Sequence, residues 1–348
     1  ITAALPTINY LLKQQNKLIL ITHLGKPKQR EQKFSLKPVA DRLQQLLPEE
    51  KIILVNDFLT ADHQIFSGQT DKEILLLENI RFYPEEKNND PAFAKKLATL
   101  ADAYVNDGFA VCHRPDASVV GITNYLPSYG GLLFKQEIEI IRKITTQPAT
   151  PVVTILGGAK ISTKIKLIEK LVTQAEHILI GGAMANDFLK AQGFEIGASL
   201  YEPDYLSTAK NLIGKVILPI DVRIGKTDET QTPVIKKITE IAADEVILDI
   251  GPETEKMFGK IISQAKTIIW NGPLGYFENP LFSIGTKAVY QAIVTNTQAS
   301  SLVGGGDTLT AIKDFPQQDK ITHISTGGGA MLELLEQGTL PGITALER

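Results

Sequence analysis

Residues 152–160 read VVTILGGAK, an apolar run that ends in two adjacent glycines and leads into a helical pattern. The same features return at LIGGAMA (179–185), LVGGGDT (302–308) and STGGGA (325–330). Glycine permits close backbone approach, and the N-terminus of a following helix presents unpaired N–H groups that attract phosphate. A tight turn that serves packing alone would explain one such stretch. Four of them in one half of the chain favour a nucleotide or phosphate site.

Short apolar runs followed by helical patterns recur along the rest of the chain. We expect strands at Lys17–Ile21, Lys51–Val55, Glu73–Leu77, Ala103–Asn106, Val119–Thr123, Val152–Leu156, His177–Ile180, Lys215–Pro219, Glu245–Asp249, Thr267–Trp270, Ser301–Val303 and His323–Ser325. We expect helices near Leu5–Gln15, Ser35–Leu47, Pro91–Leu100, Thr163–Thr173, Ala183–Ala191, Asp204–Ile213, Pro233–Ile241, Glu253–Gln264, Ile284–Thr295 and Ala330–Gln337. Runs such as ILLL and IILV are apolar on both faces, which is typical of parallel strands covered by helices on each side. The sequence therefore predicts an α/β fold with two doubly wound parallel-sheet domains.

The predicted boundary between the two domains lies in residues 128–150. Gly130 and Gly131 precede the charged amphipathic stretch LLFKQEIEIIRKITTQ, which is followed by the loop PATP. This pattern predicts one long helix between a first domain at 1–127 and a second at 151–325. A helix that belongs to a single domain is the alternative.

Composition excludes several classes of protein. The 348 residues carry 36 Lys and Arg against 39 Asp and Glu, which gives a net charge of -3. The chain therefore lacks the positive electrostatic field that attracts nucleic acid or an anionic membrane. No apolar run approaches the roughly 18 residues of a membrane span. Cys112 is the only cysteine, which excludes an intrachain disulfide and a Cys-rich zinc site and fits a cytoplasmic setting.

The usual nucleotide fingerprints are missing from the second half. No stretch fits G-x-x-x-x-G-K-[ST] or G-x-G-x-x-G, so neither a P-loop protein nor a dinucleotide dehydrogenase is indicated. Lys160 and Lys164 are four residues apart, which predicts one helix face beside the Gly157–Gly158 turn and suits a polyphosphate. Two solvated lysines are the alternative. Asp307 follows three glycines, where a carboxylate either caps a helix or holds Mg²⁺ beside a phosphate.

The first half offers basic residues just after its predicted strands. His23 and Lys26 lie in ITHLGKPK, Arg81 in LLENIRFYPEE and Arg114 in VNDGFAVCHRPDAS. Ligands of open α/β sheets bind at the carboxyl ends of the strands. Together these side chains predict a pocket for a small dianion, whereas each one alone is an ordinary surface base or hydrogen-bonded histidine.

Eight motifs in this order resemble the phosphoglycerate kinase family over essentially the whole chain: ITHLGKPK, LLLENIRFYPEE, YVNDGFAVCHR, ILGGAKISTKI, LIGGAMANDFL, IIWNGPLGYFE, VGGGDT and HISTGGGAMLELLEQGTLPGITAL. The resemblance implies two Rossmann-like domains joined by a long helix, with residues 326–348 returning to the first domain. It implies the reversible, Mg²⁺-dependent transfer of the acyl phosphate of 1,3-bisphosphoglycerate to ADP, which gives 3-phosphoglycerate and ATP in glycolysis. It also implies a cytoplasmic monomer without nucleic-acid or membrane partners.

The matching motifs also imply residue roles. The triose ligands would be His23, Lys26, Arg81 and Arg114, and the catalytic groups Lys160, Arg81, Gly328 and Gly329 at the Gly327–Gly329 turn. The nucleotide ligands would be Gly158, Lys160, Lys164, Gly181, Gly182, Asn271, Pro273, Glu278, Gly305, Gly306, Asp307 and Thr308, with Asp307 as the metal ligand. Three positions depart from the family pattern, because Lys26 replaces an arginine, Ala183 a glycine and Thr163 an acid. Lysine keeps the charge of arginine but lacks its bidentate fork, so we expect weaker triose binding.

The family's opening strand, which carries Arg-Val-Asp-x-Asn-x-Pro, has no counterpart here, and Ile1 lies in the helix that follows that strand. We therefore expect this sequence to be part of a longer gene product, with that strand in the middle of the first sheet. Two other classes of function stay open. A catalytically silent nucleotide-binding protein of this fold is disfavoured by the intact Lys160, Lys164 and Asp307, and a scaffold module by the four glycine turns.

Overall fold

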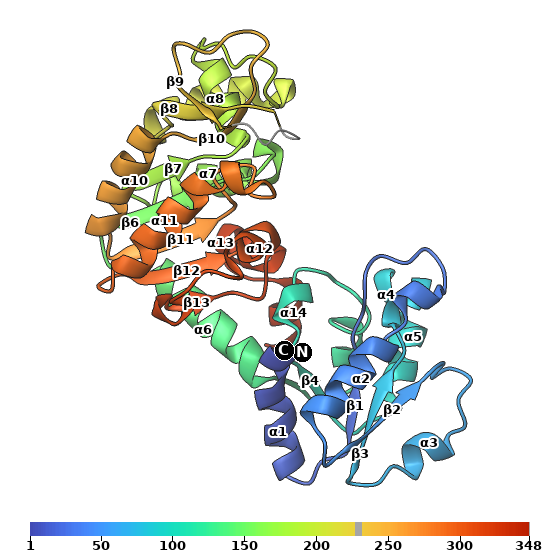
Figure 1. Cartoon of the computed structure of the whole chain (residues 1–348). Helices are drawn as coiled ribbons and strands as arrows, with labels where there is room; N and C mark the ends of the chain where they lie inside the picture. Colours follow the sequence, from blue (N-terminus) through green and yellow to red (C-terminus); the bar gives the residue numbers. More distant parts are fainter. Residues whose placement is uncertain (227–231, 348) are drawn as a thin grey trace. The chain divides into compact units, whose positions relative to one another are not determined.

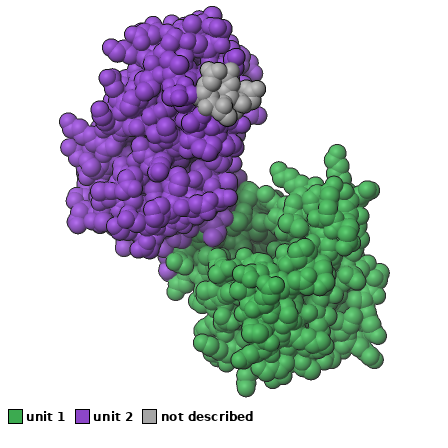
Figure 2. Space-filling view, in the orientation of Figure 1, with its two compact units in different colours: residues 1–138, 339–348 green, residues 139–338 purple. Residues whose placement is uncertain are grey.

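The computed structural model describes residues 1–226 and 232–347, and the chain divides into two compact units. Unit 1 comprises Ile1–Ile138 with Thr339–Arg348, and unit 2 comprises Glu139–Gly338 (Figure 2). The chain passes from one unit to the other within the helix α6 (Leu132–Thr146). Both units carry parallel sheets with helices, which confirms the predicted α/β class and its two Rossmann-like parts.

Unit 1 is built on the parallel strands β1 (Leu18–Leu20), β3 (Glu73–Leu77) and β2 (Lys51–Val55), in that order across the sheet (Figure 1). The last four residues of β3 are fully buried, and their side chains point alternately into two different cores, because side chains alternate along a strand. Ile74 and Leu76 pack with the helices α1 (Leu5–Lys13) and α2 (Lys37–Leu46). Leu75 and Leu77 pack with α5 (Pro91–Ala98) on the other face.

A second, smaller sheet of unit 1 pairs β4 (Tyr104–Asn106) with β5 (Ser128–Gly130). Within residues 1–226 and 232–347, β1 pairs only with β3 and β4 only with β5, so no strand joins the two sheets. The strand predicted at Val119–Thr123 is wrong. The amides of Val119 and Val120 bond back to the Asp116 carbonyl, which starts helical turns that continue as the 3-10 segment Gly121–Asn124.

The C-terminal segment of unit 1 is the helix α14 (Pro341–Leu346), which packs near β5. The Gly342 amide donates to the Cys112 carbonyl at 2.9 Å, and a side chain at this glycine would lie about 3 Å from Cys112. The short helices α3 (Gln64–Ser67) and α4 (Pro84–Lys87) complete the unit.

Unit 2 is built on five parallel strands in the order β13–β12–β11–β6–β7 (Figure 1). Their bounds are β6 (Val152–Leu156), β7 (His177–Ile180), β11 (Thr267–Asn271), β12 (Ser300–Gly304) and β13 (His323–Ile324). The helices of this unit are α7 (Ile165–Leu171), α8 (Met184–Ala191), α9 (Leu206–Leu212), α10 (Pro252–Gln264), α11 (Ile284–Thr295), α12 (Gly306–Ile312) and α13 (Gly329–Gln337). Trp270 on the central strand is fully buried among Val153, Phe258 and Tyr290. None of the helices in the described residues is long and apolar enough to cross a membrane.

An antiparallel sheet in unit 2 departs from the sequence prediction. Its strands are β8 (Asp221–Ile224), β9 (Val234–Lys237) and β10 (Ile247–Ile250), with β8 in the middle. The helix predicted at Pro233–Ile241 is wrong, because its apolar residues Val234 and Ile235 are each 54% exposed in an edge strand rather than on a buried helix face. The strand predicted at Lys215–Pro219 is also wrong, since only Ile217 makes a bridge, to Leu179. The other predicted strands and helices lie close to their predicted places.

A buried carboxylate fixes the end of β3. Glu78 is 6% exposed and accepts hydrogen bonds from the Leu36 amide at 2.7 Å, the Asn79 amide at 2.8 Å and the Ser35 hydroxyl at 2.7 Å. These bonds join the end of the central strand to the start of α2. Glu78 therefore holds the end of the loop between β1 and α2, the loop that carries His23 and Lys26.

We predict that Glu78→Ala lowers the free energy of unfolding of unit 1 by about 2–3 kcal/mol, because it leaves buried donors without partners. Hydrogen exchange should show the Leu36 amide losing protection. The control is Glu85→Ala, which removes an exposed carboxylate from α4 and should change stability by less than about 0.5 kcal/mol. Equal effects of the two substitutions would contradict this role of Glu78.

Candidate functional site

A cavity of about 330 Å³ lies at the carboxyl ends of the central strands of unit 2. Its lining is rich in glycine, with Lys160, Lys164 and Asp307 as its charged groups. The lining residues are Gly158, Ala159, Lys160, Thr163, Lys164, Asn271, Gly272, Gly305, Gly306, Asp307, Thr308, Gly328, Gly329 and Leu332. We call this the phosphate cradle. It brings together ten of the site residues expected from the sequence: Gly158, Lys160, Lys164, Asn271, Gly305, Gly306, Asp307, Thr308, Gly328 and Gly329.

The turns around the phosphate cradle pack backbone against backbone. Gly272 has a φ of +97°, and a side chain there would lie 2.2 Å from the Gly157 carbonyl oxygen. Gly182 has a φ of +66°, and a side chain there would lie 2.7 Å from the Gly158 nitrogen. Only glycine combines this φ with this close approach. The adjacent glycines after β6 and β7 and the single Gly272 after β11 therefore serve packing and site formation together.

Lys164 holds two of these turns together. Its side chain is buried, and its Nζ donates to the Gly157 carbonyl and, at 3.2 Å, to the Asn271 carbonyl. Burial lowers the pKa of the Lys164 ammonium to about 8, and the nearby Asp307 carboxylate opposes that shift. The ammonium therefore stays mostly charged at neutral pH and joins the turn after β6 to the turn after β11.

Lys160 lies in a different environment. It is exposed and extended, with a φ of −130°, and it precedes the 3-10 turn Ile161–Thr163. The helix α7 begins only at Ile165, so the prediction that Lys160 and Lys164 share one helix face is wrong. Both reach the phosphate cradle from the loop before the helix, one buried and one exposed.

Polar side chains join the remaining turns of the phosphate cradle. The Thr308 hydroxyl accepts from the Gly272 amide at 2.7 Å and donates to the Gly304 carbonyl at 3.0 Å. Asn271 Nδ2 donates to the same carbonyl at 2.7 Å, and the Trp270 indole donates to the Gly272 carbonyl at 2.9 Å. The core of the sheet is therefore connected directly to the turns.

Asp307 lies exposed in the first turn of α12. Within the described residues, no three His, Cys, Asp or Glu side chains gather as a complete metal site. Mg²⁺ at nucleotide sites commonly takes only one or two protein carboxylates and completes its shell with phosphate oxygens and water. The single carboxylate of Asp307 at the edge of the phosphate cradle fits an ion of that kind.

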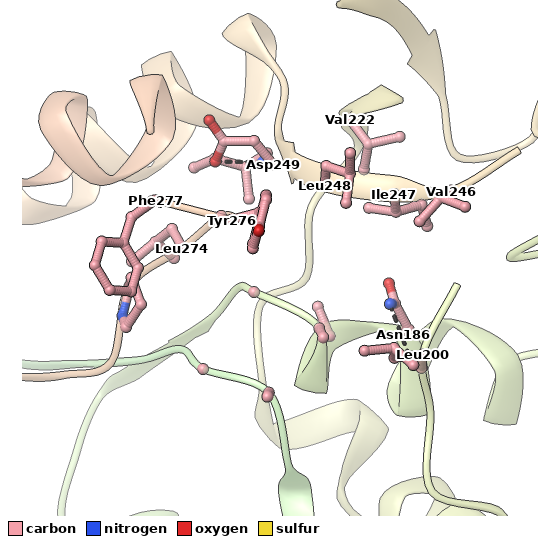
Figure 3. Close-up of a pocket in the computed structure, with 18 of the residues that line it drawn as sticks. Asn186, Leu200, Val222, Val246, Ile247, Leu248, Asp249, Leu274, Tyr276 and Phe277 are labelled. Atoms are coloured by element: carbon pink, nitrogen blue, oxygen red, sulfur yellow. Dashed lines mark hydrogen bonds between the residues drawn. The ribbon is translucent and has the colours of Figure 1, made fainter. Parts of the chain in front are cut away.

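A second cavity, of about 420 Å³, shares Gly158, Ala159 and Asp307 with the phosphate cradle. Its walls are mainly aliphatic and come from α8, the segment 198–200, the antiparallel sheet and the loop after β11 (Figure 3). The aliphatic lining residues are Ala183, Ala185, Leu189, Ala198, Leu200, Val222, Val246, Ile247, Leu248, Ile250 and Leu274. We call this the apolar cleft. Its shape and lining suit a planar apolar group attached to a phosphate chain.

The expected nucleotide residues Gly182, Pro273 and Glu278 line the apolar cleft, whereas Gly181 does not. A side chain at Gly181 would lie 2.1 Å from Leu274 Cδ1, so this glycine makes room for the wall rather than forming it. Sequence analysis missed Leu200, Val246 and Leu248 as site residues, because aliphatic residues have the same pattern in a core and in a cleft.

Asp249 lies behind the apolar cleft and is 2% exposed. Its carboxylate accepts from the Gly285 amide at 2.8 Å and from the Ile250 amide at 2.9 Å. The Arg223 Nη1 atom lies 3.7 Å from Asp249 Oδ2. Burial raises the pKa of Asp249 to about 7, while the Arg223 guanidinium opposes the rise. Both carboxylate oxygens are bonded to the protein, so Asp249 supports the wall of the cleft.

In unit 1 the expected basic residues lie near one another. Arg81 is 8% exposed, and its Nη1 donates to the Gly25 carbonyl at 2.8 Å, which links the turn after β3 to the loop after β1. Burial and the nearby Arg114 guanidinium both lower the pKa of His23. Lys26 is exposed on the same loop as His23. The region is therefore positive and lies after β1, β3 and β4, as an anion site requires.

Asn79 positions this loop, and sequence analysis missed it although it lies in the quoted motif LLENIRFYPEE. Asn79 is fully buried, and its Nδ2 donates to the Leu24 carbonyl at 2.8 Å and the Phe34 carbonyl at 2.9 Å. Its Oδ1 accepts from the Arg81 amide at 3.1 Å. One side chain therefore holds the loop of His23 and the backbone of Arg81.

Two buried acids lie close to the basic residues. Glu86 is 2% exposed and accepts from the Ser118 amide at 2.9 Å and the Ser118 hydroxyl at 2.5 Å. Burial raises its pKa to about 7, and the neighbouring Asp116 adds to the rise. Burial likewise raises the pKa of Asp116, against the pull of Arg114. Protonation of Glu86 thus reduces the negative charge near Arg114.

The chain is similar to known proteins over nearly its whole length. The family model described as Phosphoglycerate kinase matches residues 1–338. A phosphoglycerate kinase of Koribacter versatilis is 48% identical over 363 residues, which cover 99% of this chain and 90% of the relative. That of Dictyoglomus turgidum is 46% identical over 358 residues, covering 100% of this chain and 90% of the relative. The solved phosphoglycerate kinase of Coxiella burnetii superposes with a TM-score of 0.87 at 38% identity, covering 99% of this chain and 90% of that one.

We predict that stability falls as pH rises from about 4.5 to about 7, because folded Glu86 holds a proton that the unfolded chain has released. Glu86→Gln should remove the part of this dependence that Glu86 contributes, since an amide can accept from the Ser118 amide and donate to its hydroxyl. Urea unfolding should show the variant gaining up to about 3 kcal/mol over the parent between pH 5 and pH 8. The matched control, Glu85→Gln, should show no pH-dependent gain. A Glu86→Gln gain that is the same at both pH values would contradict the assignment.

Proposed function

This chain belongs to the phosphoglycerate kinase family, and we propose which of its own residues perform the family's transfer of a phosphoryl group between 1,3-bisphosphoglycerate and ADP. The observation that carries the proposal is the continuity of the two cavities in unit 2. The apolar cleft and the phosphate cradle share Gly158, Ala159 and Asp307. A base in the cleft therefore has its phosphates among the glycine turns and lysines of the cradle.

The phosphate cradle supplies positioning and charge. We assign Lys160 to the transferring phosphoryl group, because it is the exposed cation of the cradle. Lys164 carries a buried positive charge toward the same place, and the amides of Gly328 and Gly329 add donors at the start of α13. Fixed charges of this kind stabilise the charge that spreads over the phosphoryl oxygens in the transition state. ADP attacks as an anion, so direct in-line transfer needs neither a general base nor a phosphoenzyme.

Asp307 would hold Mg²⁺ together with the phosphates of the nucleotide. When bound, the ion neutralises phosphate charge, which is the chemistry it supplies in phosphoryl transfer. Asp307 belongs to both cavities, so it lies where the base-binding and phosphate-binding parts of the site join.

We assign the triose to the basic residues of unit 1, His23, Lys26, Arg81 and Arg114. The guanidinium of Arg114 and the imidazole of His23 influence each other electrostatically, and Arg81 is bonded to the His23 loop. Transfer requires that the triose and the nucleotide come together and that water stays away from the acyl phosphate. We therefore propose that unit 1, unit 2 and the connecting α6 are joined flexibly enough to allow this. We further propose a cytoplasmic monomer, which is usual in the family.

The catalytically silent alternative finds no support in the site, because Lys160, Lys164 and Asp307 all line the phosphate cradle. A coupled assay of ATP formation from 1,3-bisphosphoglycerate and ADP separates the two functions. Turnover supports the kinase, and ADP binding without turnover supports the silent protein.

We predict that Lys160→Ala lowers kcat roughly a hundredfold while changing the Kd of ADP far less, because the lysine acts on charge that develops during transfer. Lys166→Ala is the matched control, since Lys166 is an exposed lysine on α7 outside both cavities. That variant should keep kcat. An equal loss of kcat and of ADP affinity in Lys160→Ala would show that Lys160 binds the ground state and that its assignment to the phosphoryl group in transit is wrong.

A further inference from the structure

The apolar cleft contains a buried polar side chain that the proposed function does not use. Asn186 lies near the start of α8, is 1% exposed and lines the cleft opposite Ile247 (Figure 3). Its Nδ2 donates to the Leu200 carbonyl at 2.9 Å. Its Oδ1 is buried and, among the residues that the structure describes, has no hydrogen-bond partner. Buried acceptors without partners are rare in folded proteins and call for an explanation.

The orientation of the Asn186 amide is fixed by its neighbour. A backbone carbonyl can only accept, so the amide nitrogen must face Leu200 and the oxygen must face away. Figure 3 shows the oxygen on the side of the cleft and the nitrogen toward Leu200. A flipped amide would place its oxygen against the Leu200 carbonyl. The cleft therefore presents a hydrogen-bond acceptor and not a donor at this point of its wall.

The other buried polar group at this wall, Asp249, is already satisfied. Its two carboxylate oxygens accept from the Ile250 and Gly285 amides. The remaining walls near Asn186 are aliphatic, from Leu189, Leu200 and Ile247. Beside Asn186, a ligand in the cleft therefore meets aliphatic side chains and this acceptor.

We propose that Asn186 Oδ1 accepts a hydrogen bond from the exocyclic 6-amino group of the bound purine and makes the site selective for adenine nucleotides. This inference rests on the proposed function, because it assumes that the apolar cleft holds the base. Adenine carries an amino donor at position 6, whereas guanine carries a carbonyl acceptor there. A 6-oxo purine would place acceptor against acceptor, and relieving that repulsion by an amide flip would break the bond to Leu200.

The test is a set of calorimetric titrations with the Mg²⁺ complexes of three nucleotides: ADP, GDP and purine riboside 5′-diphosphate, which lacks the 6-amino group. The parent protein should bind ADP roughly three- to tenfold more tightly than purine riboside diphosphate, as one neutral hydrogen bond allows, and GDP more weakly still. Asn186→Leu keeps the approximate shape and removes the acceptor. In this variant the ratio of the ADP and purine riboside diphosphate affinities should fall to about one, as expected when the hydrogen bond is lost.

The matched control is Leu248→Ala, which removes aliphatic wall without touching the acceptor and should weaken all three nucleotides by the same factor. The parent protein alone can overturn the inference, if it binds ADP and purine riboside diphosphate equally. An affinity ratio that survives in Asn186→Leu overturns it as well. Failure of the proposed function looks different, because the parent would then neither bind ADP nor form ATP.

Discussion

The nucleotide site depends on the hydrogen bonds of one buried ammonium group, that of Lys164. Lys164 donates to the carbonyls of Gly157 and Asn271, which end two neighbouring strands of the unit 2 sheet. A charge in such a place is costly unless hydrogen bonds and an opposite charge offset the loss of water, and here the carbonyls and the Asp307 carboxylate do so. The turns are thus held in place before any ligand arrives, which is what electrostatic preorganisation requires.

Unit 1 follows the same rule with a neutral side chain. Asn79 is fully buried and bonds to three backbone groups, so it holds the loop that carries His23 and the turn that carries Arg81. In each unit a buried polar group maintains the turn, while an exposed cation, Lys160 or Lys26, stays at the surface where a ligand can reach it. Because different side chains hold the turns and bind the ligand, the exposed cation can bind a negatively charged ligand without disturbing the hydrogen bonds that hold the turn.

Sequence patterns predicted those parts of the molecule that local chemistry decides. The ILLL run on the central strand of unit 1 is buried on both faces, and the glycine pairs lie at strand ends around a cavity. The spacing of Lys160 and Lys164 was misleading, because a 3-10 turn precedes the helix and gives the two lysines unequal burial. Spacing predicts a shared face only where the helix has already begun.

Other parts could not be predicted because they depend on contacts between distant segments. The apolar cleft joins Leu200, Val246 and Leu274, and aliphatic side chains look alike in a cleft and in a core. The sequence pattern around Val234 and Ile235 is typical of a helix face, although both residues are exposed in the edge strand of an antiparallel sheet. Asn79 and Asn186 are ordinary residues in the sequence, and only their burial and bonding partners distinguish them.

The claim that Lys164 holds the site together is tested most directly by hydrogen exchange in Lys164→Met. The amides of Gly157 and Gly158 bond to the Asn271 and Pro273 carbonyls across the two turns that Lys164 joins. We predict that these amides exchange at least about tenfold faster in the variant, as loss of a buried charged hydrogen bond implies, while amides of unit 1 keep their rates. Unchanged exchange at both glycines, with loss of nucleotide affinity alone, would show that Lys164 acts on the ligand and not on the turns.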